Sequence, residues 1–195
     1  VQTADGPVFA DKVVLAAGAW CAVLAQSVGL NRPLIPLRRS VLRSESHALA
    51  TAEHPYCWAE DKGLYLLPHE GSWLASPCDE AIAWPAAGSS SWEAPAEEAS
   101  RWIKDRVEIL FPTLARLSFA EGWSGLRTFA PDRRPVLGRD PALEGLWWAA
   151  GLGGFGVSCS YAVGDALAAW MREDIPHVAI VLGAGEAEVG PLVLP

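Results

Sequence analysis

Basic residues are not in excess in this sequence. Lys and Arg number 15 against 23 Asp and Glu, so the formal net charge at pH 7 is −8. Because proteins that bind nucleic-acid phosphates need clustered Lys and Arg, this balance argues against a nucleic-acid partner. Also absent are an apolar run near the ~20 residues that span a bilayer and a basic stretch leading into an apolar one at the start. We therefore expect a soluble, cytoplasmic chain without an integral membrane segment.

Cysteine is scarce and scattered. The four cysteines are Cys21, Cys57, Cys78 and Cys159, with no C-x-x-C pair and no histidine at metal-ligand spacing. Structural zinc sites and disulfide frameworks both need cysteines at regular spacing. We therefore expect reduced thiols and no metal site.

The apolar content, in contrast, is high enough for a folded core. Hydrophobic residues make up 51% of the 195 positions, and ten of them are tryptophan. Large aromatic side chains contribute much buried area, so most of these tryptophans should lie in the core. The length suits one domain, or a small domain with an appendage.

The first twenty residues predict a hairpin followed by a buried strand. "VQTADGPVFADKVVLAAGAW" contains an Asp5–Gly6 turn between two short strands and then the apolar run 13–17. A buried strand of this kind belongs to the middle of a sheet. We therefore expect other strands of its sheet to lie on residues missing from this sequence, or on another chain.

Periodicity predicts the remaining elements. A short helix over residues 20–28 should end at Gly29, and a hairpin should turn at residues 69–71. An amphipathic helix is expected at 97–111, stopped by Pro112. The strands are expected near residues 34–44, 64–68, 72–76 and 117–127.

A glycine-rich turn stands out at residues 147–171, "WWAAGLGGFGVSCSYAVGDALAAWM". Gly151, Gly153 and Gly156 have G-x-G-x-x-G spacing between a strand-like and a helix-like run, as in a dinucleotide fingerprint. Such a fold also needs a second strand ending in an acidic residue, which "HVAIVLGAGE" with Glu186 could supply, but little chain remains to complete it. The turn could also serve only to pack the helix on the strand, or could bind another part of a ligand.

Six segments, in order, resemble one protein family. They are "DKVVLAAGAW", "PLIPLRR", "GLYLLP", "SPCDE", "GWSGLRTFAPDRRPVLG" and "GLWWAAGLGGFGVSCSYAVGDALAAWM". Over roughly residues 1–177 the chain resembles the C-terminal part of FAD-dependent oxidoreductases of the D-amino-acid oxidase type. The D-amino-acid dehydrogenase branch is most similar, with glycine oxidase and sarcosine oxidase more distant.

The resemblance implies an α+β fold. A mixed or antiparallel sheet would form the substrate domain, and further strands and a helix at about 157–171 would be remnants of a Rossmann-like FAD domain. The implied division is 1–30 and 127–175 for the FAD-domain remnants, 31–126 for the substrate-binding domain and 176–195 for a tail. Strands 13–17 and 146–150 should then be neighbours.

The resemblance also implies FAD as cofactor, with its dinucleotide fingerprint in a portion that this chain lacks. The glycine turn would approach the flavin ring instead, since backbone N–H groups at a helix N-terminus stabilise the negative charge of reduced flavin. The implied cofactor contacts are Gly153, Gly154, Phe155, Gly156 and Val157, together with Ala17, Gly18 and Ala19. The last three could equally be an ordinary strand-to-helix turn.

The implied substrate contacts are Arg127, Arg38, Tyr65 and Gly154. The planar fork of arginine suits a substrate carboxylate. Arg127 could alternatively form a structural salt bridge, and Tyr65 could be a core residue. Arg38 is adjacent to Arg39, which points to the opposite face of a strand, so a one-residue register error would exchange their roles.

Two further residue types have no implied catalytic role. Asp132, in "APDRRP", is expected to form a turn. The four histidines, His47, His54, His69 and His177, fall in loops or turns. The catalytic residue therefore stays unassigned.

As implied by the resemblance, the function is oxidation of the C–N bond of a small amino acid by hydride transfer to FAD. The substrate would be a D-amino acid, glycine, an N-methyl amino acid or a related amine. The alternative is a non-catalytic fragment or subunit that needs a partner to supply the dinucleotide-binding half.

Overall fold

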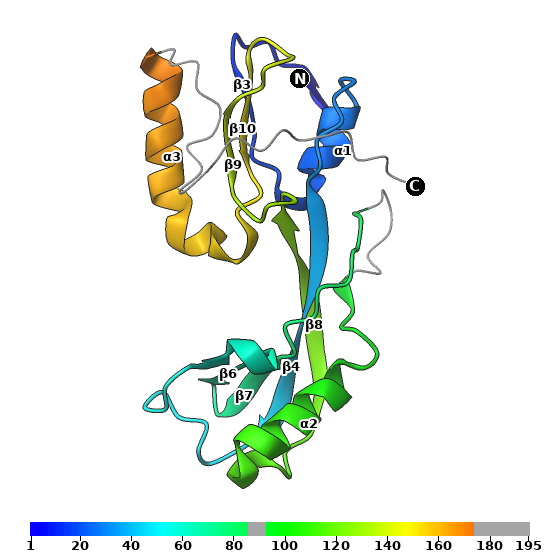
Figure 1. Ribbon diagram of the computed structural model, residues 1–195, viewed down its shortest axis with the longest axis vertical. Helices are drawn as coiled ribbons and strands as arrows, with labels where there is room; N and C mark the ends of the chain where they lie inside the picture. Colours follow the sequence, from blue (N-terminus) through cyan, green and yellow to red (C-terminus); the bar gives the residue numbers. More distant parts are fainter. Residues whose placement is uncertain (86–92, 174–195) are drawn as a thin grey trace. The chain divides into compact units, whose positions relative to one another are not determined.

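The computed structural model describes residues 1–85 and 93–173 (Figure 1). The chain forms two compact units: unit 1 comprises Val1–Pro36 and Arg127–Pro195, and unit 2 comprises Leu37–Leu126. Unit 2 is thus inserted in sequence between the two parts of unit 1. The predicted tail at 176–195, His177 and the strand ending at Glu186 lie outside the described residues. Within the described ranges, no helix is both long and apolar enough to cross a membrane.

Unit 1 contains a three-stranded sheet in the order β3-β10-β9 (Figure 1). Strand β10 (Leu146–Ala150) runs parallel to β3 (Val13–Leu15) and antiparallel to β9 (Val136–Arg139). The prediction that residues 13–17 and 146–150 form neighbouring strands is confirmed. A parallel pair needs a long connection, and here that connection contains the whole of unit 2.

The first strands and the first helix follow the sequence pattern. Strands β1 (Gln2–Thr3) and β2 (Gly6–Pro7) form the expected antiparallel hairpin. A 3₁₀ turn, η1 (Gly18–Trp20), leads into helix α1 (Cys21–Gln26), which is shorter than predicted. The chain leaves this helix at Gly29, whose φ of +78° favours glycine.

The longest helix of unit 1 follows β10. A 3₁₀ turn, η5 (Gly153–Phe155), leads into α3 (Gly156–Glu173), close to the predicted helix at 157–171. Near the other end of α3, the Nζ atom of Lys12 donates a hydrogen bond to the carbonyl of Met171 at 2.5 Å. A cation at a helix C-terminus is favourable because the carbonyls there carry partial negative charge.

A buried carboxylate fixes the connection between β9 and β10. Asp140 is 2% exposed and accepts hydrogen bonds from Nε and Nη2 of Arg32 at 2.9 and 2.8 Å. Trp148 Nε1 donates at 2.9 Å, and the N–H groups of Ala142 and Leu143 donate at 2.8 and 3.2 Å. Burial alone would raise the pKa of Asp140, but Arg32, the Ala142 N–H and Trp148 outweigh it and lower that pKa.

Unit 2 is built on a five-stranded sheet in the order β5-β6-β7-β4-β8, in which the strand pairs β5/β6, β6/β7 and β7/β4 are antiparallel. The strands are β4 (Ile35–Ser46), β5 (Cys57–Ala59), β6 (Leu64–His69), β7 (Ser72–Ser76) and β8 (Phe119–Phe129). Four of them match the predicted strands, and β6 and β7 form the predicted hairpin. Strand β5 was not predicted because only three residues form it.

Helix α2 (Ala99–Leu110) covers one face of this sheet, as predicted for residues 97–111. Ala99, Ile103 and Val107 recur every four residues and are at most 1% exposed. They pack against apolar side chains of the sheet, and the shared core includes Leu42, Leu64, Leu66, Trp73, Ala75 and Phe119. Short 3₁₀ turns, η2 (Glu60–Lys62) and η4 (Pro112–Leu114), connect β5 to β6 and α2 to β8.

Candidate functional site

Two loops of unit 1 lie at the same edge of its sheet. The candidate residues Ala17, Gly18 and Ala19 follow β3, and the glycine turn at 151–156 follows β10. Since β3 and β10 are parallel, both loops leave the carboxyl ends of adjacent strands. That edge is where sheets of this kind bind ligands, with helix N-termini and backbone N–H groups directed at them.

Of the three candidate residues in the loop after β3, only Gly18 is exposed to solvent. The N–H of Ala17 donates to Cys21 Sγ at 3.1 Å, and Ala19 is 4% exposed, whereas Gly18 is exposed. Burial raises the pKa of the Cys21 thiol, against a smaller lowering by the Ala17 N–H, so this thiol stays protonated. Cys21 therefore has a structural role in shaping the loop.

The glycine turn needs glycine at position 153 for two reasons. Its φ is +56°, and a Cβ atom there would lie 2.6 Å from Cε1 of Phe129. The following Phe155 N–H donates to the carbonyl of Leu152 at 3.0 Å. Helix α3 then begins at Gly156 with no acidic residue in its first turn, so nothing negative competes with a ligand for this end.

Arg127 lies against this turn. It is the ninth residue of the 11-residue strand β8 and is exposed. A Cβ atom on Gly154 would lie 3.0 Å from Nη1 and 3.4 Å from Cζ of Arg127, so the guanidinium packs directly on the Gly154 backbone. The structure thus brings together two of the four predicted substrate residues, one of which is also a predicted cofactor contact.

Tyr65 lies on the open face of the unit 2 sheet. It alternates along β6 with Leu64 and Leu66, which are buried in the core under α2. Its side chain therefore stands on the face away from α2, half-buried beside its cross-strand neighbour Trp58.

Arg38 lies on the other face of the same sheet. It is four residues before Leu42 on β4, and Leu42 belongs to the core under α2. With Trp102 and Arg106 of α2, it lines a hollow of about 340 Å³. The structure therefore does not bring Arg38 and Tyr65 together.

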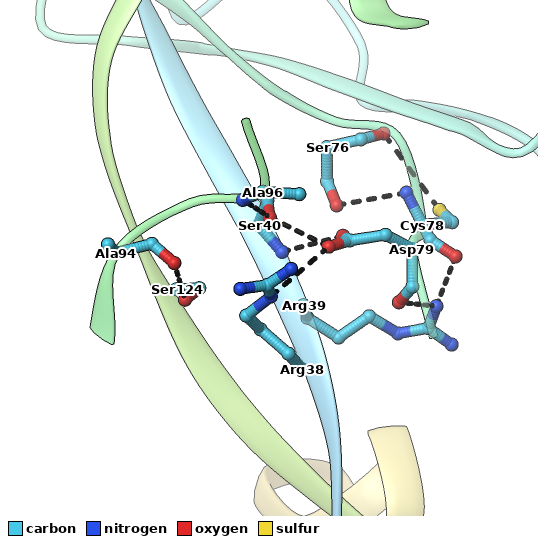
Figure 2. Close-up of polar contacts among 9 residues, drawn as sticks. All are labelled: Arg38, Arg39, Ser40, Ser76, Cys78, Asp79, Ala94, Ala96 and Ser124. Carbon is cyan, nitrogen blue, oxygen red and sulfur yellow. Dashed lines mark hydrogen bonds and ion pairs between the residues drawn. The ribbon is translucent and has the colours of Figure 1, made fainter. Parts of the chain in front are cut away.

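The two adjacent arginines contact the segment that follows β7 (Figure 2). Asp79 accepts hydrogen bonds from the N–H and Oγ of Ser40, each at 2.7 Å, and Arg38 Nε lies 3.9 Å from Oδ2 of Asp79. Arg39 donates to the carbonyl of Asp79 and to Oε1 of Glu80, the latter at 2.6 Å. Arg39 is therefore held by hydrogen bonds, whereas Arg38 has a longer ionic contact.

The other predicted polar residues are structural. Oδ1 of Asp132 accepts a hydrogen bond from the N–H of Arg134 at 3.0 Å, which confirms its predicted role in a turn. Across residues 1–85 and 93–173, no group of three or more His, Cys, Asp or Glu side chains could hold a metal ion.

A family profile described as FAD dependent oxidoreductase (DAO) matches residues 1–170. The chain belongs to this family. The predicted family and its cofactor, FAD, are thereby confirmed.

Relatives within the FAD dependent oxidoreductase family include enzymes that act on amino acids. The chain is 31% identical over 156 residues to glycine oxidase of Pseudomonas putida, covering 75% of this chain and 38% of that protein. It is 31% identical over 174 residues to D-amino acid dehydrogenase of Paramagnetospirillum magneticum, covering 86% and 38%. The structure of glycine oxidase from Geobacillus kaustophilus aligns with a TM-score of 0.66 at 26% identity, over 89% of this chain and 44% of that one. The α+β fold is thus confirmed, and the chain spans less than half the length of each relative.

Sequence reasoning missed Phe129, which contacts the glycine turn. The predicted strand ended at residue 127, two residues earlier than β8 does. Extended to 129, it would have placed Phe129 on the same face as Arg127. It also missed the pairing of Arg32 with Asp140, which are 108 residues apart. No local pattern connects those two positions.

Proposed function

We propose that this chain is the part of a flavin-dependent oxidoreductase that binds the flavin edge and the carboxylate of a small amino acid. The whole protein would oxidise the C–N bond of that amino acid by hydride transfer to FAD. One observation carries the proposal: the guanidinium of Arg127 packs on Gly154, inside the turn at the carboxyl ends of β3 and β10. In this proposal, a group that binds a carboxylate thus lies in contact with a turn suited to a flavin.

The residues of this turn fit a flavin ring. Gly154 is exposed and has no side chain, so its backbone can approach a flat ligand closely. Of the predicted cofactor contacts, the N–H groups of Gly154, Gly156 and Val157 lead into α3, whose positive end favours the negative edge of reduced flavin. The N–H of Phe155 is bonded to the carbonyl of Leu152, so Phe155 would contact the cofactor through other atoms. Bound FAD supplies the electron acceptor, and the exposed Gly18 backbone at the same sheet edge is a further contact.

Arg127 orients the substrate. Its planar guanidinium can donate two parallel hydrogen bonds to a carboxylate and stays ionised at all relevant pH values. Held against Gly154, it would place the amine-bearing carbon of an amino acid at the flavin edge. Arg38 is a weaker candidate for binding the carboxylate, because its guanidinium lies near Asp79 on the α2 side of its sheet. The role of Tyr65 in substrate binding stays a prediction.

The substrate class follows from the relatives. Glycine oxidase and D-amino acid dehydrogenase are named for substrates that carry a carboxylate next to an amine carbon. We infer a D-amino acid, glycine or an N-methyl amino acid for this protein. In this proposal residues 1–30 and 127–175 serve the flavin, 31–126 serve the substrate, and 176–195 are a tail.

Large apolar side chains on unit 1 favour a second candidate, in which the chain works only with a dinucleotide-binding segment. Phe9, Tyr161 and Val157 are 90%, 87% and 97% exposed. Side chains of this kind are normally covered in a finished protein. A segment that brings the missing G-x-G-x-x-G fingerprint would cover them and hold the adenosine half of FAD.

The deciding experiment is anaerobic reduction in a protein that contains these 195 residues and holds FAD. Glycine, N-methylglycine and a panel of D-amino acids are added separately, and loss of the flavin absorbance is followed. We expect bleaching by at least one of them and much slower bleaching by the corresponding amines that lack a carboxylate. If amines and amino acids bleach the flavin equally fast, Arg127 does not select a carboxylate and the proposal is wrong.

A further inference from the structure

The side chain next to Arg127 on the same face of β8 also contacts the glycine turn. Arg127 meets Gly154, and Phe129, two residues later, meets Gly153. A Cβ atom on Gly153 would lie 2.6, 3.1 and 3.2 Å from three carbon atoms of the Phe129 ring. Non-bonded carbon atoms do not approach to 2.6 Å, so the ring fills the space that a side chain at position 153 would need.

A second contact holds the ring in place. The guanidinium carbon of Arg133 lies 4.9 Å from the centroid of the Phe129 ring, a cation–π distance. The N–H of Arg133 donates to the carbonyl of Ala130 at 2.9 Å, which closes a turn directly after the strand. Phe129 is therefore fixed from its own strand end as well as from the glycine turn.

Besides Phe129, Arg127 contacts the glycine turn, at Gly154, but the composition of the turn makes its backbone flexible. "GLGGFG" contains four glycines in six residues, and glycine gives the backbone more freedom than any other residue. Among the described residues, no side chain caps the 3₁₀ turn Gly153–Phe155. A bulky ring against Gly153 restricts this freedom at the residue that directly precedes the flavin-contacting N–H groups.

We propose that Phe129 is a positioning residue for the flavin-contacting turn. Its ring takes the place of the absent side chain at position 153 and so holds the N–H groups of Gly154, Gly156 and Val157 in the arrangement that faces the flavin. The flavin part of this inference rests on the proposed function. The packing part stands on the contacts of the chain itself.

The test uses the isotope-labelled 195-residue chain and its Phe129→Ala and Phe129→Tyr variants. The probe is hydrogen exchange of the Phe155 amide, which is bonded to the carbonyl of Leu152 in the turn. We expect exchange at least about 10-fold faster in Phe129→Ala, because the turn then opens locally, and near the original rate in Phe129→Tyr, which keeps the ring. The matched control is Leu137→Ala, which removes a buried side chain from β9 of the same unit and should leave this amide within about 3-fold of its original rate.

A second measurement adds FAD at millimolar concentration to the same samples. Amide resonances of residues 154–157 should shift in the unchanged chain and in Phe129→Tyr, but not in Phe129→Ala. If the Phe155 amide exchanges equally slowly in Phe129→Ala and in the unchanged chain, the positioning role is wrong. If FAD shifts no resonance even in the unchanged chain, the isolated chain does not hold the cofactor, and the exchange rates alone decide the positioning role. The proposed function is tested separately, by reduction of flavin in the FAD-loaded protein.

Discussion

The guanidinium of Arg127 and the backbone of Gly154 are in direct contact, although 27 residues separate them along the chain. The contact joins the end of β8 to the turn before α3. It places the group best suited to a carboxylate beside the backbone best suited to a flavin edge. The first and third predictions below depend on it.

Substitution of Arg127 should impair use of the substrate more than it impairs stability. In an FAD-loaded protein containing this chain, Arg127→Lys keeps the charge without the planar fork, and Arg127→Ala removes both. A charge-assisted bidentate pair is worth ~2–4 kcal/mol in a poorly solvated site, so kcat/KM should fall about 30-fold to 1000-fold. Flavin content should stay the same.

The control for Arg127 is a substrate pair. Steady-state kinetics are measured with an amino acid and with the amine that lacks its carboxylate, beside a melting curve. An equal loss for both compounds that tracks a loss of stability would make Arg127 a structural salt-bridge residue instead.

The 195-residue chain alone should bind FAD weakly. The chain covers 38% of the two curated relatives described above, and we expect the contacts to the adenosine half of FAD to lie outside it. Donors at the flavin edge are too few to offset the translational and rotational freedom lost on binding. Titration followed by flavin fluorescence checks this prediction. Saturable binding at submicromolar concentration would contradict it.

Gly154→Ala should displace Arg127 without straining the backbone. The φ of Gly154 lies outside the positive region, but the new Cβ atom would sit 3.0 Å from Nη1 of Arg127. We expect kcat/KM in the FAD-loaded protein to fall about 3-fold to 10-fold, because the guanidinium must move by a few tenths of an ångström and a misplacement of about 1 Å costs ~100-fold. The melting temperature should change little.

A glycine in the middle of α3 supplies the matched control. A Cβ atom on Gly164 meets nothing within 4 Å, so Gly164→Ala should stabilise the helix by about 0.5–1 kcal/mol with unchanged kinetics. If Gly154→Ala behaves like Gly164→Ala, the contact with Arg127 has no part in substrate binding.

Asp140 should make stability depend on pH at the acid end. Its pKa is below the ordinary value of 3.8, so its contribution is fully present above that value and is lost as the pH falls through the lowered pKa. Asp140→Asn should cost about 1.5–3 kcal/mol near neutral pH, because it weakens charge-assisted hydrogen bonds to Arg32, whose side chain is 32% exposed and stays partly solvated. It should also flatten the acid side of the stability curve.

Thermal melts of both chains between pH 2 and pH 7 check the role of Asp140. If the two curves stay parallel throughout, titration of Asp140 does not contribute to acid unfolding. A loss of thermal stability near neutral pH, without a change in how stability falls at acid pH, would then be an effect of packing.

Loss of Arg39 should destabilise unit 2 more than loss of its neighbour Arg38. Arg39→Ala removes hydrogen bonds to a backbone carbonyl and to Glu80, so it should destabilise unit 2 by about 1–3 kcal/mol. Arg38→Ala removes an ionic contact of 3.9 Å to Asp79 and should cost less than about 1 kcal/mol. Urea unfolding of both variants compares them. A tenfold rise of KM in Arg38→Ala at unchanged stability would restore Arg38 as a substrate residue.

The elements with strong local patterns were predictable from the sequence. Helical spacing of apolar residues predicted the helix at 97–111 from Trp102, Val107, Leu110 and Phe111, but the most buried residues of α2 are Ala99, Ile103 and Val107. The apolar runs at 13–17 and 146–150 identified the core strands. The glycine turn was located correctly because glycine spacing is local information. The pairing of the two core strands came from the family resemblance rather than from periodicity.

The covered face of a strand and the tertiary partner of a residue were harder to predict than the helices and strands themselves. Alternation places Arg38 and Arg39 on opposite faces of a strand, but only the packed helix α2 decides which face is covered. The contact of Phe129 with Gly153 and the pairing of Asp140 with Arg32 join segments that are distant in sequence. Such pairs form through tertiary packing, which local sequence propensity does not predict.

The insertion of unit 2 within unit 1 has a consequence for the order of folding during synthesis. Strand β3 ends at Leu15, but its partner β10 begins only at Leu146, so at ribosomal rates β3 waits on the order of ten seconds for its partner. Unit 2 is continuous in sequence and can complete its sheet first. Strand β3 is therefore open to chaperones and proteases while unit 2 is being synthesised.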